Sequence, residues 1–296
     1  MKFTLPAFLD NRTARLLRRM GSRYVSHHVG LESAALAFYL IFAIFPFLIV
    51  ISALLSFFRL DLAEALQPVE GILPGDVATL LGRFLLYISG TPNPRLVISN
   101  LAVSIYFPMR ATNSLMISVR RAYHLGSPRG FFVQVLKNFL YTIVLMVTVV
   151  LTVVLMTVSD HILAFAVENL NLPPFAAELW AALRFPVTAV VVYFALFFLY
   201  ALAQDSRQGW RDLWPGTLAA MGGWMLASWL YALYVNNIAH YSLLYGSIGT
   251  VMVLLIWLNL SSMALILGAE LNGTLMSLRK EPRPSADPGE SPDAKP

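Results

Sequence analysis

The apolar positions of this chain come in long blocks that are separated by short polar segments. Between Leu213 and Ala269 the sequence holds no Asp, Glu, Lys or Arg. A helix rises about 1.5 Å per residue, so this block is far longer than the roughly 30 Å hydrocarbon core of a bilayer. The polar residues at 236–240 divide it. The pattern therefore predicts two membrane-spanning helices that are joined at a membrane surface.

Four more apolar blocks precede this one. The predicted spans cover residues 33–58, 95–118, 139–159, 185–203, 214–235 and 245–270. The second block is short and is also compatible with a re-entrant segment. We favour a crossing, because a re-entrant segment would put the basic residues of 110–137 opposite the basic N-terminus, against the positive-inside rule. We therefore expect an all-α integral membrane protein, a six-transmembrane-helix bundle with short amphipathic surface helices and both termini in the cytoplasm.

The two ends of the chain differ from this membrane domain, which we place at residues 31–273. Residues 1–30 predict a basic amphipathic helix that either lies on an anionic leaflet or packs on the protein's own inner face. Residues 274–296 predict a disordered cytoplasmic tail, because they become rich in Pro, Ser and Asp from Glu281 on. In the polar segment between the first two spans, Asp76 predicts the N-cap of a short external surface helix.

The composition agrees with a membrane protein. Hydrophobic residues make up 58% of the chain and charged residues only 12%, whereas a soluble domain has about 25% charged residues. There is no cysteine, which excludes disulfides and thiolate metal sites. The net charge of +5 could indicate nucleic acid, but the basic residues adjoin the spans, where anionic headgroups are the nearer partner. We expect membrane lipids as partners and no nucleic acid.

Two features predict how the spans are shaped and packed. Pro46 in the first span removes a backbone hydrogen bond and predicts a kink. Ala219, Gly223 and Ala227 recur every four residues in the fifth span. Such a ridge of small residues predicts close packing against another helix.

Four motifs follow one another along most of the chain. They are Ala34-Ala35-Leu36-Ala37-Phe38-Tyr39 leading to Pro46, Trp210-Arg211 before Pro215-Gly216, Tyr245-Gly246-Ser247 with Trp257, and Gly268-Ala269-Glu270-Leu271-Asn272. With these motifs the chain resembles the YihY/virulence factor BrkB membrane proteins, once labelled ribonuclease BN. The resemblance implies a six-span protein of the bacterial inner membrane with cytoplasmic termini and no firmly assigned activity, for which transport of envelope lipids or solutes has been proposed. Two positions depart from the pattern: Leu115-Met116 stand where an aromatic residue is expected, and Gln204 stands where a proline is expected.

Polar residues in or beside the spans are the candidate functional residues. Arg110 and Asn113 lie one turn apart on the same face of the second span and could bind an anionic substrate or lipid. Alternatively, Arg110 extends to the cytoplasmic headgroups and marks the end of the helix. Tyr39 and Asn259 could continue the polar path, or form hydrogen bonds between helices without a role in transport.

A second set of candidates lies at the cytoplasmic ends of the spans. Glu32 begins the first span, and Glu270 and Asn272 end the sixth. A carboxylate there could pair with Arg110 or with a loop arginine and form a gate, or it could be a solvated residue of the interface. A carboxylate at the C-terminus of a helix opposes the helix dipole, which favours a specific partner for Glu270.

Enzyme chemistry finds no support in the motifs. The five histidines are split between the two sides of the membrane without metal-ligand spacing, and neither a Gly-rich phosphate loop nor a Gly-x-Ser-x-Gly elbow occurs. We expect no enzyme, no metal and no cofactor, and a ribonuclease is disfavoured.

The leading hypothesis is transport or flipping of a lipid or an amphipathic envelope solute, including an anionic one. The alternative is a non-transporting envelope scaffold or assembly protein, with a homo-oligomer or an envelope protein as partner.

Overall fold

The computed structural model describes residues 12–57, 79, 82–83, 94–126, 130–170, 175–204, 209–237 and 247–280. These residues are helical and contain no strand, which confirms the all-α class. The helices are α1 (Arg12–Ser26), α2 (Val29–Phe57), α5 (Pro94–Ala122), α6 (Phe131–Leu170), α7 (Phe175–Ala203), the 3-10 helix η2 (Trp210–Asp212), α8 (Trp214–Asn237) and α10 (Ser247–Lys280). The predicted spans 95–118, 139–159, 185–203 and 214–235 fall within α5, α6, α7 and α8, and the described parts of the spans 33–58 and 245–270 fall within α2 and α10.

Several of these helices have the length and apolarity of membrane spans. Among the described residues, four helical segments qualify, namely Phe131–Thr152, Ala182–Ala203, Trp210–Val235 and Ile248–Arg279. The bent pair of Ala14–Ser26 and Val29–Ile44 passes the same test only when it is counted as one span, which gives four or five candidate spans. The chain is therefore a membrane protein with several spans, and the number six, with crossings by α2 and α5, stays a prediction.

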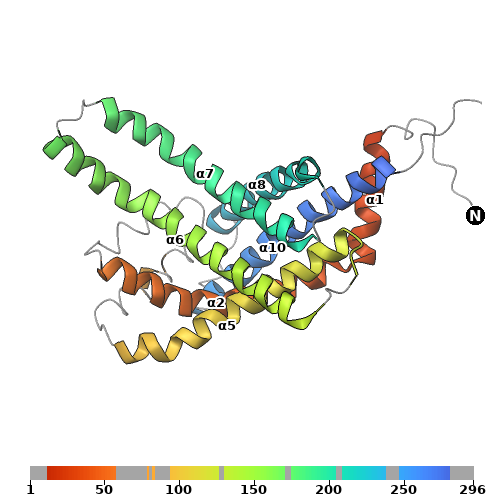
Figure 1. Cartoon of the computed structure of the whole chain (residues 1–296), viewed down its shortest axis with the longest axis horizontal. Coiled ribbons are helices and arrows are strands. Elements are labelled where there is room, and N and C mark those ends of the chain that lie inside the picture. The colour runs from red at the N-terminus through yellow and green to blue at the C-terminus, as the bar shows by residue number, and fades with distance from the viewer. Residues whose placement is uncertain are drawn as a thin grey trace, which may run out of the picture.

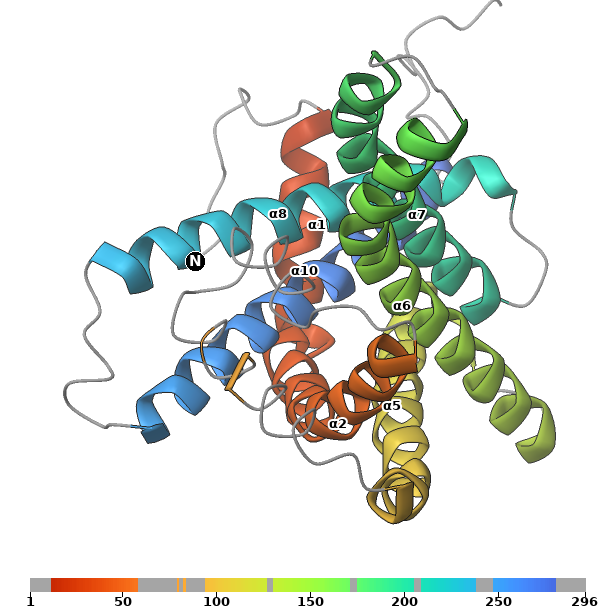
Figure 2. The ribbon, with the colours of Figure 1, turned by 90° about the vertical axis from the view of Figure 1, so that its left-hand side faces the viewer.

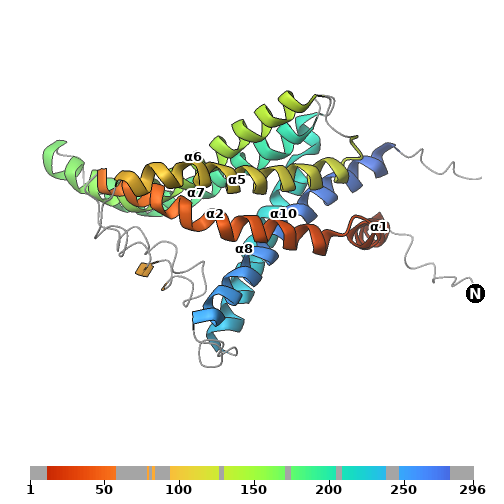
Figure 3. The same cartoon turned by 90° about the horizontal axis from the view of Figure 1, so that it is seen from below.

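The long helices pack as three pairs of chain neighbours, α2 with α5, α6 with α7, and α8 with α10. Helix α10 is central, because it also contacts α1, α2 and α5. In Figures 1 and 3 the pairs converge toward the end that carries α1 and diverge at the other end. Figure 2 looks onto the divergent end and shows the three pairs pointing to different sides. We call these two ends the converged end and the spread end.

The closest helix contact joins α8 to α10 near the converged end. A Cβ atom added to Gly268 would lie 2.5 Å from Cβ of Ala220, 2.5 Å from the carbonyl oxygen of Gly216 and 2.8 Å from the hydroxyl of Tyr200. A Cβ on Gly216 would in turn collide with the carbonyl oxygen of Gly268. The two backbones can approach this closely only because both positions lack a side chain.

Indole hydrogen bonds fix the register of the same pair farther along. Trp224 Nε1 donates to Ser261 Oγ, and Trp257 Nε1 donates to Ser228 Oγ, each over 3.1 Å. The two bonds run in opposite directions between antiparallel helices. Together they fix both the rotation and the sliding of α8 against α10.

This rotation corrects the packing ridge that the sequence suggests. Ala219 and Gly223 lie on the exposed side of α8, and Ala227 is half-buried. A Cβ on Gly223 would meet only Cβ of Ala264, at an ordinary 3.9 Å. Helix α8 carries two stripes of small residues, and the tryptophan bonds turn the stripe of Gly216 and Ala220 toward α10.

Helix α1 folds back at the converged end. It meets α2 at a bend of 60°, where His28 adopts a positive φ of 53°. Its inner face packs on α10, and Thr274 Oγ1 donates to Met20 Sδ over 3.5 Å. Helix α1 therefore packs on the protein itself, while the side of the membrane on which it lies and its binding to a leaflet stay predictions.

Helix α10 also extends past the domain boundary expected at residue 273. It continues to Lys280, and Thr274 and Met276 are buried, so residues 274–280 are helix rather than tail. The reason is the contact with α1, which gives these residues a surface to pack on. Several predictions concern positions outside the described residues. They are the tail from residue 281 on, Tyr245, Gly246, and Asp76 with most of its expected helix. Position 46 lies within α2, but the side chain of Pro46 is not described, so the predicted kink stays untested.

The glycine contact leads to a stability prediction. Gly268→Leu should destabilise the protein by at least about 3 kcal/mol, because the branched side chain has to displace the backbone of Gly216 as well as Ala220. Gly223→Leu is the matched control and should stay within about 0.5 kcal/mol of the parent, since it adds the same atoms on an open face. Thermal unfolding of both purified variants in one detergent measures the difference. Equal melting temperatures would contradict the assigned contact.

Candidate functional site

A buried carboxylate lies at the centre of the converged end. Glu270 of α10 is 1% exposed, and two groups of the α1 segment donate to it. His27 Nδ1 lies 2.5 Å from Oε1, and Arg23 Nη1 lies 3.4 Å from Oε2. Because α10 continues for ten residues after Glu270, to Lys280, this carboxylate does not stand at a helix C-terminus as expected. Its specific partners are Arg23 and His27 rather than Arg110.

Arg23 links three helices at this point. Its Nη1 also donates to the carbonyl oxygen of Ala122 over 3.0 Å, and its Nη2 lies 2.9 Å from Nε2 of His124. An arginine can only donate, so His124 accepts this bond on an unprotonated Nε2. Burial, Arg23 and His27 all lower the pKa of His124 below its ordinary 6.5, which favours that neutral state.

The second carboxylate of the predicted gate has a partner of its own. Glu32 Oε1 accepts from Arg121 Nη1 over 2.6 Å, and Oε2 accepts from Ser118 Oγ over 3.2 Å. This pair fastens the start of α2 to the end of α5. Glu32 therefore pairs with an arginine, but the arginine is Arg121 in the last turn of α5 rather than Arg110 or a loop residue. The role of this pair in a cytoplasmic gate stays a prediction.

Asn272 joins three elements through its amide. Its Oδ1 accepts from the backbone nitrogen of Gly216 over 2.6 Å, and its Nδ2 donates to the carbonyl oxygen of Leu213 over 2.8 Å and to the hydroxyl of Tyr123 over 3.1 Å. Burial raises the pKa of Tyr123 to about 12, so its hydroxyl stays protonated. Asn272 thus holds the ends of α5, α8 and α10 together.

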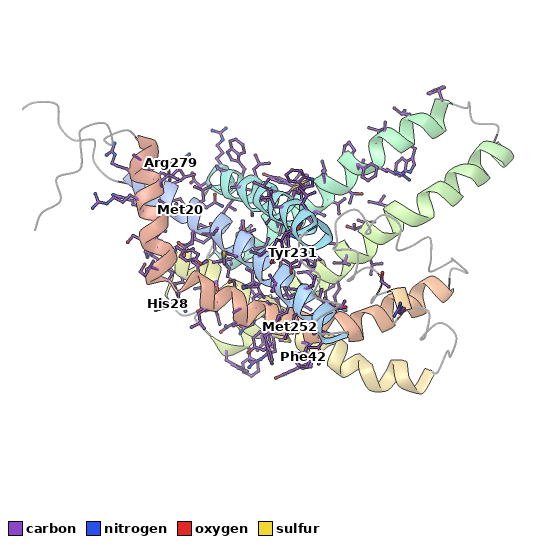
Figure 4. The ribbon with its side chains drawn as sticks, turned by 180° about the vertical axis from the view of Figure 1, so that it is seen from behind. Met20, His28, Phe42, Tyr231, Met252 and Arg279 are labelled. Carbon is purple, nitrogen blue, oxygen red and sulfur yellow. The ribbon has the colours of Figure 1, made fainter. Side chains whose placement is uncertain are left out.

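Arg110 occupies a different part of the molecule. Its side chain is exposed, and its guanidinium carbon lies 5.6 Å from the ring centroid of Tyr39 on α2. Among the described residues no carboxylate lies within ion-pair distance of Arg110. Phe38, Phe42 and Tyr106 are exposed aromatic residues of the same two helices, and the ring centroid of Phe38 lies 5.7 Å from that of Tyr39. Figure 4 shows Phe42 well along α2 from His28, toward the middle of the molecule.

Asn113 does not face the same site. Its Oδ1 accepts from Asn138 Nδ2 over 2.7 Å and from Gln134 Nε2 over 3.2 Å, both on α6. A buried bond between the hydroxyls of Thr112 and Thr142, 2.8 Å long, continues this contact. Asn113 therefore joins α5 to α6, and the expected shared site with Arg110 is not formed.

Arg110 lies well inside its helix. It stands about 12 residues before the end of α5, which is roughly 18 Å along the helix, and Tyr39 stands about 10 residues, or roughly 15 Å, after the start of α2. Both roles expected for Arg110, binding a substrate and extending to the headgroups, stay predictions, because the crossing of the membrane by α5 is itself a prediction.

The remaining polar candidate, Asn259, is half-buried in the middle of α10. Its Oδ1 is buried and has no hydrogen-bond partner among the described residues. The structure does not bring it to Arg110.

Sequence reasoning missed Arg23, His27 and His124, although Arg23 follows Leu16 and Met20 at helical spacing on the inner stripe of α1. A cation on an apolar stripe was the signal that could have identified it.

The chain has relatives over nearly its whole length. It is 29% identical over 266 residues to the putative ribonuclease-like protein YfkH of Bacillus subtilis (strain 168), covering 90% of this chain and 97% of that one. It is 26% identical over 283 residues to a UPF0761 membrane protein of Verminephrobacter eiseniae (strain EF01-2), covering 93% of this chain and 64% of that one. A UPF0761 membrane protein of Albidiferax ferrireducens (strain ATCC BAA-621 / DSM 15236 / T118) is 24% identical over 271 residues, covering 90% of this chain and 62% of that one. The chain thus spans less than two thirds of the length of these two UPF0761 relatives.

No solved structure matches the chain. The family model described as Virulence factor BrkB matches residues 20–293, which include the described helices from the second half of α1 to the end of α10. This match confirms the resemblance carried by the four sequence motifs. The chain belongs to the Virulence factor BrkB family of membrane proteins.

Proposed function

We propose that this protein lets an anionic lipid or a related amphiphile cross the bacterial inner membrane by binding its headgroup at Arg110. The observation that carries the proposal is an exposed arginine about 18 Å from the end of its helix, with an aromatic ring as its contact. Ionisable residues at mid-membrane depth are costly and usually mark the path of a substrate or ion.

The chemistry around Arg110 fits a phosphate headgroup. The planar guanidinium can hold two phosphate oxygens through parallel hydrogen bonds while one face rests on Tyr39. The exposed Phe38, Phe42 and Tyr106 offer apolar contacts to acyl chains. Arg110 would lower the barrier that a headgroup meets in hydrocarbon, and the movement would run along the outer surface of α2 and α5.

A passage through the bundle fits the structure less well. The Gly216–Gly268 contact, the Asn272 bonds and the Glu270 cluster fill the converged end with packed backbone and paired polar groups. A solid converged end also suits the alternative of a scaffold or assembly protein, in which Arg110 binds a lipid without moving it. In both cases we infer a role without catalysis, cofactor or nucleic acid.

We infer six spans with both termini in the cytoplasm. The converged end carries Arg23, Arg121 and Arg279 together with the exposed aromatic residues Trp210 and Trp214, as expected for the cytoplasmic interface. Arg279 pairs there with Asp212. The spread end would then face the outside.

The topology can be tested with reporter fusions. Fusions after Glu64 and after Glu168 should report an external position, and fusions after Ser127 and after Lys280 a cytoplasmic one, because the basic segments stay inside. An external Ser127 would remove α5 as a span, and with it the mid-membrane position of Arg110.

The lipid proposal can be tested with purified protein in vesicles that contain a fluorescent phosphatidylglycerol. The parent should speed the exchange of this lipid between leaflets, and Arg110→Gln should slow that exchange at least about tenfold, as expected when one charge-assisted contact is lost. Arg110→Lys should keep part of the rate, because lysine lacks the planar fork. Arg18→Gln, which removes an exposed arginine of α1, is the control and should match the parent.

Two outcomes would contradict this function. If Arg110→Gln exchanges lipid at the parental rate, Arg110 is not the headgroup site. If the parent itself moves no lipid although native mass spectrometry shows Arg110-dependent binding of phosphatidylglycerol, the protein is a lipid-binding scaffold.

A further inference from the structure

The polar cluster around Glu270 has a charge balance that depends on two imidazoles. Arg23 supplies one positive charge and Glu270 one negative charge, and both side chains are largely withdrawn from water, with exposed fractions of 11% and 1%. His27 and His124 stand within this pair, with their rings 5.9 Å apart in an edge-to-face arrangement. With both rings neutral the cluster carries no net charge. With both protonated it carries two uncompensated positive charges.

The two histidines respond differently to a proton. His27 donates from Nδ1 to the carboxylate, and it can do so in the neutral and in the protonated state. His124 accepts from Arg23 on Nε2, and a proton there would remove this bond and set two cations face to face. His124 is therefore the member of the cluster whose protonation breaks a contact.

We propose that His124 binds a proton from the cytoplasmic side and so controls the docking of α1 on α5 and α10. With His124 neutral, Arg23 fastens α1 through Glu270, Ala122 and His124. With His124 protonated, the repulsion between His124 and Arg23 releases the helix. This proposal concerns the cluster at the converged end and is independent of lipid movement at Arg110.

The other charged groups around the cluster do not supply the missing negative charge. Glu32 on α2 is occupied by Arg121 of α5, which also donates to the carbonyl oxygen of His27 over 3.2 Å. Tyr123 of α5 stays neutral, because its pKa is raised to about 12. Asp212 of η2 pairs with Arg279. Within the part of the chain that the structure describes, acidification therefore adds positive charge without a free carboxylate beside the cluster to receive it.

The direction of the pH dependence follows from the lowered pKa of His124. An unfolded or released His124 binds a proton near pH 6.5, whereas the docked residue does so only at lower pH. The docked state is thus fully stabilised above pH 6.5, and it loses stability as the pH falls from 6.5 through the lowered pKa. Acid releases α1, and neutral or alkaline pH docks it.

The absence of cysteine from the sequence makes a thiol-accessibility experiment direct. Thr274 is 0% exposed and lies under α1 against Met20. Thr274→Cys in the full chain in lipid nanodiscs is treated with a methanethiosulfonate reagent between pH 8 and pH 5. At each pH, the rate of thiol modification of Thr274→Cys is divided by the rate measured for Trp210→Cys, a position on η2 that is 76% exposed. This ratio corrects for the change in thiolate formation with pH. The ratio should rise at least about tenfold on acidification, because release of α1 exposes a thiol that the docked helix covers.

Two further variants assign the effect to the cluster. His124→Asn keeps an oxygen that can accept from Arg23 but cannot titrate, so the ratio should stay low down to pH 5. Glu270→Gln removes the negative charge and should give a high ratio already at pH 7.5. If Thr274→Cys does not fold, Met20→Cys reports on the same contact from the α1 side. A flat profile in the parent background, or the same acid rise in His124→Asn, would overturn the proposal.

Discussion

The structure depends on one constraint, which is that polar groups buried among membrane helices have to find partners within the protein. Helix α10 carries these groups in its last three turns, and each has partners on another element. Asn272 binds the backbone at the start of α8 and the hydroxyl of Tyr123, and Glu270 binds α1. These bonds are possible because Gly216 and Gly268 let α8 approach α10 closely enough for backbone nitrogen and amide oxygen to meet. Close packing and polar pairing at the converged end therefore require each other.

The same requirement explains why the molecule is tight at one end and open at the other. The converged end holds the buried carboxylate of Glu270, the two glycines and the hydroxyl of Tyr200 that donates to the carbonyl oxygen of Leu265, all of which need short distances. Toward the spread end the pairs are held within themselves, as by Trp224 with Ser261 and Trp257 with Ser228. Apolar side chains impose no such geometry between pairs, because lipid is as good a neighbour for them as protein. The pairs are therefore free to diverge there.

Sequence reasoning identified the helices well because hydrophobic blocks of membrane length leave few alternatives. It failed where the outcome depends on rotation or on distant partners. Ala219 and Gly216 both lie on small-residue stripes of one helix, and only the tryptophan bonds to α10 decide which stripe is buried. Arg23 was counted with the solvated arginines of α1, because nothing local shows that a carboxylate 247 residues away will reach it. Glu270 and Asn272 were recognised as candidates, since polar residues at the end of an apolar block need partners, but the partners themselves were set by tertiary structure.

The arginines of the converged end show what the proposed site at Arg110 would require of a bound lipid. At the converged end Arg23 and Arg121 each have a carboxylate, so the cost of withdrawing them from water is offset within the protein. Arg110 has the ring of Tyr39, and a cation–π contact contributes about 0.5 to 2 kcal/mol. Placing an arginine at the centre of a span costs about 2.5 to 3.5 kcal/mol on the insertion scale. The contact with the ring would therefore offset only part of this free-energy cost. A phosphate bound through two charge-assisted hydrogen bonds would offset the rest. A lipid can supply that phosphate from the exposed face of α2 and α5.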